Sequence, residues 1–357
     1  MPYAMYLCRP GMKNIRTYSR NDLQDIALSA GVKATQGNVL FHAIWNLGVR
    51  SFEAVEGLNA AFLQLLLTEY FLPLTQIQSR QHSKDGTIKC VIQLHDGLLV
   101  ESVLIPAGKR MTVCVSSQVG CSLSCKFCAT GFMDRQRNLL AHEIHDQVFL
   151  LNELAQEQYA ARVSNVVFMG MGEPLLNFRE VLAAVERIQD QRGLSVAPKR
   201  ITVSTAGIAK MIRALADDGR KLNLALSLHA ANDRKRNEIM AINETNSLGE
   251  LKDALEYFGA RTGNDITLEY ILLRNFNDSP EDAQELLEFY RNVPVHLINI
   301  IEYNPIDEVA FLPSEKDRTD AFAQYLLLNG ANACLRRSRG KDIDAACGQL
   351  AGKEQTE

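Results

Sequence analysis

The sequence predicts an α/β protein whose main part is a parallel β-sheet covered by helices, and three observations support this fold class. Strand-like apolar runs alternate with amphipathic helical stretches over residues 111–329, which is typical of consecutive right-handed βαβ units. The strand-like runs are apolar almost throughout, as expected for a sheet covered on both faces. The chain has 357 residues, enough for about two domains and a large core.

The composition is that of a globular protein without a basic excess. Hydrophobic residues make up 46% of the chain and charged residues 22%, which argues against bulk disorder. The 38 Lys and Arg residues are balanced by 42 Asp and Glu residues, giving a net charge of −4 at pH 7. Most nucleic-acid binders carry a basic excess, so any contact with RNA or DNA must be local.

The first part of the chain has the period of helices. Ser19 followed by Asp22 resembles a capping box, which marks the start of a helix. Apolar residues recur at helical spacing in Val39–Leu47 and in Leu58–Phe71, ahead of Pro73. We therefore expect a small helical accessory domain over residues 1–73.

The period then changes to that of strands. The runs 88–94 and 98–105 are joined through His95-Asp96-Gly97, which is a hairpin signal. This pattern predicts a short antiparallel β extension over residues 74–110.

Glu101 is an unusual residue in this extension, because it shares a strand face with Leu99, Val103 and Ile105. A carboxylate in apolar surroundings can acquire the proton affinity that acid–base chemistry needs. A structural glutamate held in a salt bridge is the alternative.

Residues 111–334 carry the alternating pattern and predict a partial barrel or an open parallel sheet. The expected strands are 111–116, 164–170, 200–205, 222–229, 265–273 and 295–303. The expected helices are 141–159, 178–191, 207–218, 247–262, 279–292 and 316–329.

Three of the eight cysteines, Cys121, Cys125 and Cys128, crowd into the loop after the first parallel strand. This clustering favours metal ligation over a disulfide framework. Three thiolates fit one iron–sulfur cluster and leave one iron open to bind a small molecule. A zinc site with a more distant fourth ligand, or cysteines of an apolar core, are the alternatives.

Polar residues and glycines follow several predicted strands, where ligands of such sheets collect. After the second strand, Gly172 allows a close backbone approach and Glu173 could bind a cationic group. The other such residues are Ser204, Ser227, His229 and Asn304. Each of them could be an ordinary strand-end cap, but their convergence on one edge of the sheet favours a binding site. No partner spacing supports His229 as a metal ligand.

The cysteine motif and its surroundings resemble a known family. Cys-x3-Cys-x2-Cys with an aromatic residue before the last cysteine resembles the signature of radical S-adenosylmethionine (SAM) enzymes. More specifically, about residues 74–351 resemble the RlmN/Cfr family of RNA adenosine methyltransferases. The strings that carry this resemblance are SSQVGCSLSCKFCATG, VVFMGMGEPLLN, SLHAANDRKR, IEYNP and RGKDIDAACGQL.

This resemblance implies a radical SAM partial (βα)6 barrel with two cofactors. A [4Fe–4S] cluster would be held by Cys121, Cys125 and Cys128, and SAM would serve as methyl donor and radical source. Electron transfer from the cluster would cleave SAM. The implied SAM pocket consists of Gly172, Glu173, Ser204, Ser227, Leu228, His229 and Asn304.

The resemblance also assigns roles to two further cysteines, Cys114 and Cys347, which on their own would be structural thiols. It implies that the C-terminal segment, residues 335–357, carries Cys347 over the active site. Cys347 would take a methyl group from SAM and transfer it to an adenine carbon. Cys114 would then release the RNA adduct by forming a Cys114–Cys347 disulfide, and Glu101 would remove the proton from the ring carbon.

The implied substrate is the adenosine of the peptidyl-transferase centre in 23S rRNA, methylated at carbon 2, with the tRNA adenosine 3′ to the anticodon as a second target. The GMGEPLLN string with Pro174 favours carbon 2. Cfr-like methylation of carbon 8, which confers antibiotic resistance, and a non-catalytic iron–sulfur or zinc protein that binds RNA are the alternatives. An external electron donor such as flavodoxin is a further implied partner.

Local groups of cations could contact RNA phosphates. They are Lys109-Arg110, Arg135, Arg137, Arg234-Lys235-Arg236, and Arg336, Arg337, Arg339 and Lys341 near the C-terminus.

No segment has the pattern of a membrane or secretion signal. The N-terminus lacks a basic region ahead of an apolar one, and the longest apolar run, Ala60–Leu67, contains Gln64. We therefore expect a cytoplasmic protein with no membrane partner.

Overall fold

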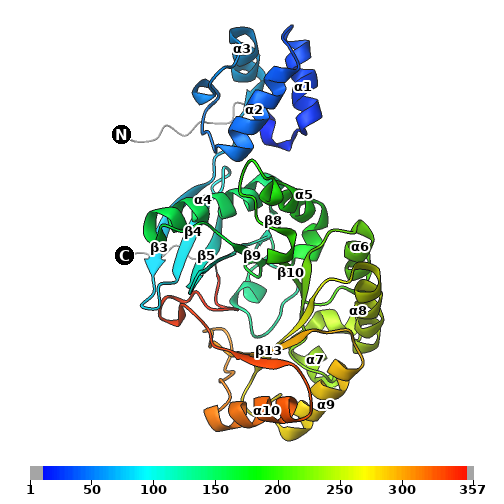
Figure 1. The fold of residues 1–357 in the computed structure, drawn as a ribbon. Helices are drawn as coiled ribbons and strands as arrows, with labels where there is room; N and C mark the ends of the chain where they lie inside the picture. The colour runs from blue at the N-terminus through cyan, green and yellow to red at the C-terminus, as the bar shows by residue number, and fades with distance from the viewer. Residues whose placement is uncertain (1–10, 352–357) are drawn as a thin grey trace.

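A computed structural model describes residues 11–351 and contains the predicted α/β architecture (Figure 1). Its main element is a ten-stranded sheet of order β14-β13-β12-β11-β10-β9-β6-β5-β4-β3. Within residues 11–351, the seven strands from β6 to β14 in this order pair in parallel, and β3, β4 and β5 extend the sheet in antiparallel pairs. The predicted combination of a parallel barrel and an antiparallel extension is confirmed.

The parallel strands curve around a central space and the helices lie outside them (Figure 1). The strands are β6 (Arg110–Cys114), β9 (Asn165–Phe168), β10 (Ile201–Thr205), β11 (Asn223–Ser227), β12 (Ile266–Leu272), β13 (Leu297–Glu302) and β14 (Ala333–Arg336). The helices are α4 (Ala141–Tyr159), α5 (Phe178–Gln189), α6 (Ala209–Asp218), α7 (Asp233–Ile239), α8 (Leu248–Thr262), α9 (Pro280–Arg291) and α10 (Lys316–Leu328).

Two of these elements, β14 and α7, are absent from the sequence prediction. β14 has only four residues, ACLR, and becomes a strand because it pairs with β13 in the register Ile298↔Ala333 to Ile301↔Arg336. α7 has the sequence DRKRNEI, in which apolar residues do not recur. The seventh parallel strand places Arg336 at the carboxyl edge of the sheet.

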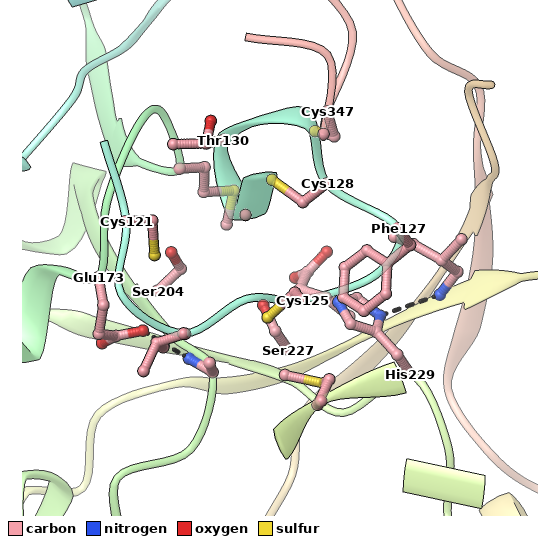
Figure 2. Close-up of a pocket in the computed structure, with 18 of the residues that line it drawn as sticks. Cys121, Cys125, Phe127, Cys128, Thr130, Glu173, Ser204, Ser227, His229 and Cys347 are labelled. Carbon is pink, nitrogen blue, oxygen red and sulfur yellow. Dashed lines mark hydrogen bonds between the residues drawn. The ribbon is translucent and has the colours of Figure 1, made fainter. Parts of the chain in front are cut away.

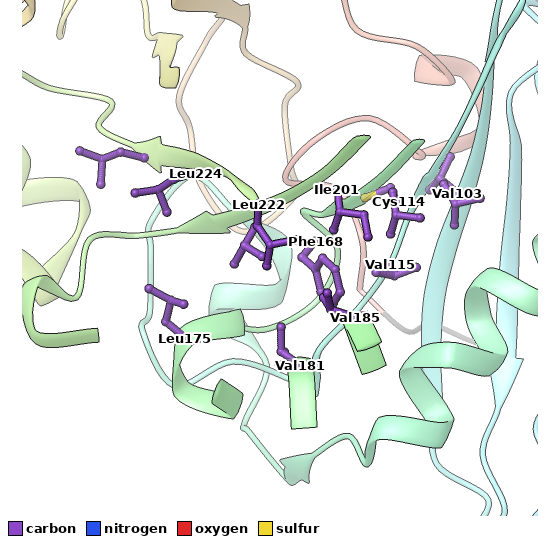
Figure 3. Packing of buried hydrophobic residues seen from close by; sticks show 14 of the residues in the cluster. Val103, Cys114, Val115, Phe168, Leu175, Val181, Val185, Ile201, Leu222 and Leu224 are labelled. Atoms are coloured by element: carbon purple, nitrogen blue, oxygen red, sulfur yellow. The ribbon is translucent and has the colours of Figure 1, made fainter. Parts of the chain in front are cut away.

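The main core lies between the parallel sheet and the outer helices. Phe168 and Ile201 from the strands belong to one buried cluster with Val181 and Val185 of α5 (Figure 3). Ser247 and Ser279 begin α8 and α9 as capping boxes, each accepting the N–H of an acidic residue three positions later. Because the strands of the main sheet from β6 to β14 pair in parallel, their carboxyl ends meet at one edge of the sheet.

The antiparallel extension consists of β3 (Gln76–His82), β4 (Ile88–Gln93) and β5 (Leu99–Ala107). β4 and β5 form the predicted hairpin, and β5 joins the parallel part through β6. Two small sheets, β1 (Lys13–Asn14) with β2 (Tyr70–Phe71) and β7 (Gln118–Val119) with β8 (Arg137–Asn138), complete the strands of the described region. The 3-10 turns are Ile15–Thr17, Phe52–Ala54, Ala129–Phe132, Pro174–Asn177, Pro198–Arg200, Ala241–Thr245 and Lys341–Ile343.

The N-terminal helices form a separate unit beside α4 and α5 (Figure 1). They are α1 (Arg20–Ser29), α2 (Thr35–Asn46) and α3 (Ala60–Glu69). Ser19 and Asp22 form the expected capping box, and the unit has its own buried cluster, which includes Phe41 and Phe62. Gly37 allows α1 and α2 to touch, since a Cβ there would lie 2.4 Å from the Leu23 carbonyl carbon.

The proposed division into residues 1–73, 74–110, 111–334 and 335–357 stays a prediction, and residues 1–10 and 352–357 lie outside the described part of the chain. No helix within residues 11–351 has the length and apolar character of a membrane span.

Candidate active site

A cavity of about 150 Å³ lies at the carboxyl ends of the parallel strands (Figure 2). Three parts of the chain meet in it: the cysteine loop, the ends of the strands, and the segment around Cys347. The sequence-predicted site residues that line it are Cys121, Cys125, Cys128, Gly172, Glu173, Ser204, Ser227, His229 and Cys347.

Backbone contacts hold the cysteine loop in place. The Lys126 N–H donates to the Ile239 carbonyl at 3.0 Å, and the Cys128 N–H donates to the Cys125 carbonyl at 3.3 Å. A Cβ at Gly131 would lie 2.5 Å from the Cys125 carbonyl oxygen, so glycine is required where the loop turns back. The loop thus directs three thiols into one cavity.

Burial makes these thiols poor acids without a bound metal. It raises the pKa of Cys121 to about 11 and also raises the pKa values of Cys125 and Cys128, which further repel each other as thiolates. Metal coordination supplies the positive charge that stabilises such thiolates. Three half-buried soft ligands in one cavity therefore fit an iron–sulfur cluster.

The three cysteines do not form a site for a single ion. Among residues 11–351, no three His, Cys, Asp or Glu side chains are grouped closely enough to hold one metal ion. In a cluster each cysteine binds a different iron, so its ligands need not converge on one point.

Glu173 is a buried carboxylate fixed by backbone amides. It accepts the Leu175 N–H at 3.0 Å and the Ala206 N–H at 2.8 Å. Burial raises its pKa to about 7, against the effect of these hydrogen bonds. Gly172 precedes it with φ +91°, and a Cβ there would lie 2.4 Å from the Gln118 Cβ. A cationic ligand group in the cavity would favour the ionised form of Glu173.

His229 faces the same cavity as a neutral imidazole. Its Nδ1 accepts the Ile271 N–H at 3.1 Å, so the ring proton is on Nε2. Burial, assisted by the charge of Arg236, lowers its pKa to about 3. The Phe127 ring meets the imidazole edge-on with 4.6 Å between ring centroids (Figure 2). His229 therefore offers one hydrogen-bond donor to a ligand and no charge.

The C-terminal segment, defined as residues 344–351, lies on the cysteine loop. The Ala129 N–H donates to the Gly348 carbonyl at 2.7 Å, and Thr130 Oγ1 donates to the Leu350 carbonyl at 2.6 Å. These bonds bring half-buried Cys347 to the cavity beside Cys128 (Figure 2).

Three expected site residues lie around the cavity without lining it. The Leu228 side chain belongs to the main core. Asn304 Nδ2 donates to the Cys347 carbonyl at 3.3 Å and to Ser338 Oγ at 3.0 Å, so it holds the C-terminal segment. Cys114 is buried near Cys347; burial first, and then the charge of Cys347, raise its pKa to about 12.

Glu101 lies in a neighbouring cavity of about 110 Å³ that also contains Lys89, Asp344 and Ala351. Its Oε1 is 3.3 Å from Lys89 Nζ, and its Oε2 accepts the Ala351 N–H at 2.9 Å. The salt bridge that was the alternative interpretation is therefore present, and Glu101 adjoins the segment that carries Cys347.

Comparisons with known proteins agree with this geometry. Residues 115–289 match the radical SAM superfamily model. The probable dual-specificity RNA methyltransferase RlmN of Cytophaga hutchinsonii is 52% identical, with 96% of this chain and 93% of that protein covered. This chain belongs to the RlmN family of radical SAM methyltransferases.

Other RlmN relatives and a solved structure extend the match over nearly the whole chain. The probable RlmN of Christiangramia forsetii is 45% identical, covering 98% of this chain and 99% of that protein. A crystal structure of a radical SAM methyltransferase from Sphaerobacter thermophilus superimposes with a TM-score of 0.89 at 35% identity, covering 95% of this chain and 99% of that one. The expected activity, SAM-dependent RNA methylation, and the expected SAM and [4Fe–4S] cofactors are confirmed for this RlmN-family enzyme.

Sequence reasoning missed Glu269 as a residue of this cavity. It lines the cavity, and its Oε1 accepts from Asn299 Nδ2 at 2.7 Å. Its Oε2 lies 3.7 Å from Nη1 of Arg336, which also lines the cavity and was expected on an RNA-binding surface. A carboxylate inside the apolar strand DITLEYILL is the signal that could have found Glu269, as it did Glu101.

The expectation that Arg236 contacts RNA is wrong. Arg236 is fully buried, where its guanidinium donates to the carbonyls of Leu228 and Ala206 and to Asn243. It supports the strand ends that carry Ser227 and His229. The exposed cations of the expected groups are Lys109, Arg110, Arg135, Arg234, Arg337, Arg339 and Lys341.

Proposed function

We propose that this enzyme methylates carbon 2 of the peptidyl-transferase-centre adenosine of 23S rRNA and of the adenosine 3′ to the anticodon in tRNA. The relatives named as dual-specificity RNA methyltransferases support two RNA substrates. The observation that carries the proposal is the position of Cys347, which lies at the same cavity as the three loop cysteines. These substrates are consistent with the cytoplasm as the site of action, and flavodoxin is a suitable electron donor.

The residues around the cavity match what the two cofactors require. Cys121, Cys125 and Cys128 would hold the cluster, Glu173 would bind the SAM ammonium group, and Ser204, Ser227 and His229 would contact other polar groups of SAM. When bound, the cluster supplies an electron and SAM supplies the methyl group and the radical chemistry.

Cys347 would carry the methyl group as a thioether before it reaches RNA. This detour has a chemical reason, because the ring carbon of adenine is electrophilic and does not attack the electrophilic methyl group of SAM. The carrier must be a nucleophile at the cavity, and Cys347 is half-buried there.

Cys114 would release the product. As a thiolate it would attack the Cys347 sulfur, so that an S–S bond forms, the bond from Cys347 sulfur to the methylene carbon breaks, and that carbon takes a proton. Glu101 would accept the proton lost from the ring carbon. The burial of Cys114 near Cys347 supports this pairing.

RNA docking would use the exposed cations near the C-terminus together with the N-terminal helical domain. Arg337 and Arg339 follow β14 and precede Cys347 within ten residues, on the approach to the cavity. The division of the chain into residues 1–73, 74–110, 111–334 and 335–357 would then separate RNA docking, the extension that carries Glu101, the barrel, and the methyl carrier.

Nucleoside mass spectrometry of rRNA and tRNA tests the proposal. RNA from cells that lack the gene should lose 2-methyladenosine, and RNA from cells that regain it should recover the modification in both RNA classes. Loss of 8-methyladenosine instead would establish the Cfr-like reaction. No change at either carbon would refute both.

A further inference from the structure

A buried ion pair on the antiparallel extension contacts the C-terminal segment. Lys89 on β4 and Glu101 on β5 are 4% and 2% exposed, and 3.3 Å separates Lys89 Nζ from Glu101 Oε1. The strand register places them diagonally, with Lys89 opposite Val103 and Glu101 opposite Val91. A lysine is rarely buried in an apolar sheet unless it is paired and its remaining protons are bound.

Both members of this pair also bind the backbone of the C-terminal segment. Lys89 Nζ donates to the Asp344 carbonyl at 3.3 Å, and Glu101 Oε2 accepts the Ala351 N–H at 2.9 Å. These contacts lie on either side of Cys347 in the sequence. One ion pair therefore fixes both ends of the short segment that presents the cavity thiol.

We propose that Lys89 is a positioning residue of the methyl transfer reaction: together with Glu101 it clamps the C-terminal segment so that Cys347 stays at the cavity. The role rests on the proposed function of Cys347 and Glu101. It differs from a purely structural role, because the two contacts hold the ends of the segment between which Cys347 lies, so their loss should displace the thiol and leave the rest of the cavity intact.

With both contacts in place, the clamp holds Cys347 at the cavity, where it can receive a methyl group. The other charged groups of the neighbouring cavity, which Lys89 and Glu101 line, are Asp307, Glu308 and Asp344, all acidic, so Lys89 is the cation that opposes them among the residues lining it.

Hydrogen–deuterium exchange of the reconstituted holoenzyme tests the clamp. In Lys89→Met, the backbone amides of residues 344–351 should exchange at least about tenfold faster than in wild type, because a hydrogen bond to a charged donor and the Glu101 counter-charge are lost. Lys89→Arg should restore most of the protection. Lys84→Met is the matched control, since Lys84 is exposed on the neighbouring β3–β4 turn and should change nothing.

An unchanged exchange rate in Lys89→Met would overturn the clamp, whether or not the enzyme methylates RNA. If Lys89→Met fails to fold, Glu101→Gln provides the same test, because it removes the charge and keeps an amide oxygen for Ala351.

Two rates of the reconstituted holoenzyme distinguish positioning from a structural role. They are the methylation of Cys347 by SAM in the absence of RNA and the reductive cleavage of SAM. In Lys89→Met, the rate of Cys347 methylation should fall at least about tenfold while the rate of SAM cleavage stays within about twofold, because only the position of the thiol has changed, and Lys89→Arg should restore most of the methylation. An equal loss of both rates would overturn the positioning role. If wild-type enzyme does not methylate RNA, the proposed function fails, and the exchange result still decides the clamp.

Discussion

The two ends of the described chain dock on the same barrel through different kinds of contact. The N-terminal unit attaches to α4 through side chains: Arg16 forms an ion pair with Asp146 at 2.8 Å, and the Trp45 ring meets the His145 ring edge-on with 5.3 Å between centroids. The C-terminal segment attaches mainly through its backbone, to Ala129, Thr130 and Glu101. The first attachment thus depends on charge and the second on backbone position.

This difference suggests separate tasks for the two ends. The backbone hydrogen bonds of the C-terminal segment position the Cys347 thiol, so most side chains of the segment are not needed for this. The N-terminal attachment leaves some polar atoms without hydrogen bonds. Within residues 11–351, Arg16 Nε, Trp45 Nε1 and His142 Nδ1 are buried and have no hydrogen-bond partner. Unsatisfied buried polar atoms weaken an interface. We therefore expect the C-terminal end to govern chemistry and the N-terminal end to govern docking.

The largest expected effect is that of Cys347→Ala. RNA methylation should fall by at least about a thousandfold, because the methyl carrier is lost and the effect of removing a nucleophile is of this order. Iron content and reductive SAM cleavage should stay near wild type. Cys334→Ala is the matched control, an exposed cysteine on β14. RNA methylation retained by Cys347→Ala would contradict the division of tasks.

Asp146→Ala tests the opposite end. The variant leaves the Arg16 guanidinium buried without its partner, which should weaken the N-terminal attachment by about 3–5 kcal/mol. Fluorescence of Trp45, the single tryptophan, reports the detachment directly. RNA affinity should fall while methylation of Cys347 in the absence of RNA is unchanged. Asp25→Ala, at an exposed position of α1, is the control. If Asp146→Ala lowered RNA affinity and Cys347 methylation equally, the two ends would not have separate tasks.

Acidification should weaken the N-terminal attachment through His142, and the loss over one pH unit should be smaller than the loss caused by Asp146→Ala. Burial lowers the His142 pKa from 6.5 to about 3, so the neutral form is favoured in the docked state. Neutral His142 stabilises the N-terminal attachment fully above pH 6.5. This stabilisation decreases as the pH falls toward 3, by up to about 1.4 kcal/mol per pH unit.

Trp45 fluorescence against pH measures this effect locally. Burial also lowers the pKa of neighbouring His145, and this group acts in the same direction. His142→Gln should flatten the acid transition. A transition of unchanged steepness in that variant would show that His142 does not control the attachment.

The sequence predicted elements that depend on local pattern. The helices α4 to α6 and α8 to α10, the β4–β5 hairpin and the Ser19 capping box follow from periodicity and from residues adjacent in the chain. The cysteine loop and the glycine before Glu173 were recognisable for the same reason. The proposed roles of Cys114, Cys347 and Glu101 come from the family resemblance and stay predictions.

Contacts between distant residues could not be predicted in this way. β14 is a strand because β13 pairs with it, and Arg236 is buried because three carbonyl and amide oxygens surround it. Lys89 reads as an ordinary charged residue of a strand until Glu101 and Asp344 are brought beside it. Periodicity carries no information on these partners, because Glu101 is 12 positions and Asp344 is 255 positions from Lys89 in the sequence.

The central claim is that Cys347 carries the methyl group, and peptide mass spectrometry of the wild-type holoenzyme tests it most directly. The enzyme is incubated with SAM labelled in the methyl group, first without RNA and then with it. The account predicts one labelled methyl group on the Cys347 peptide that disappears as label enters adenosine. An unmodified Cys347 in enzyme that still methylates RNA would contradict it.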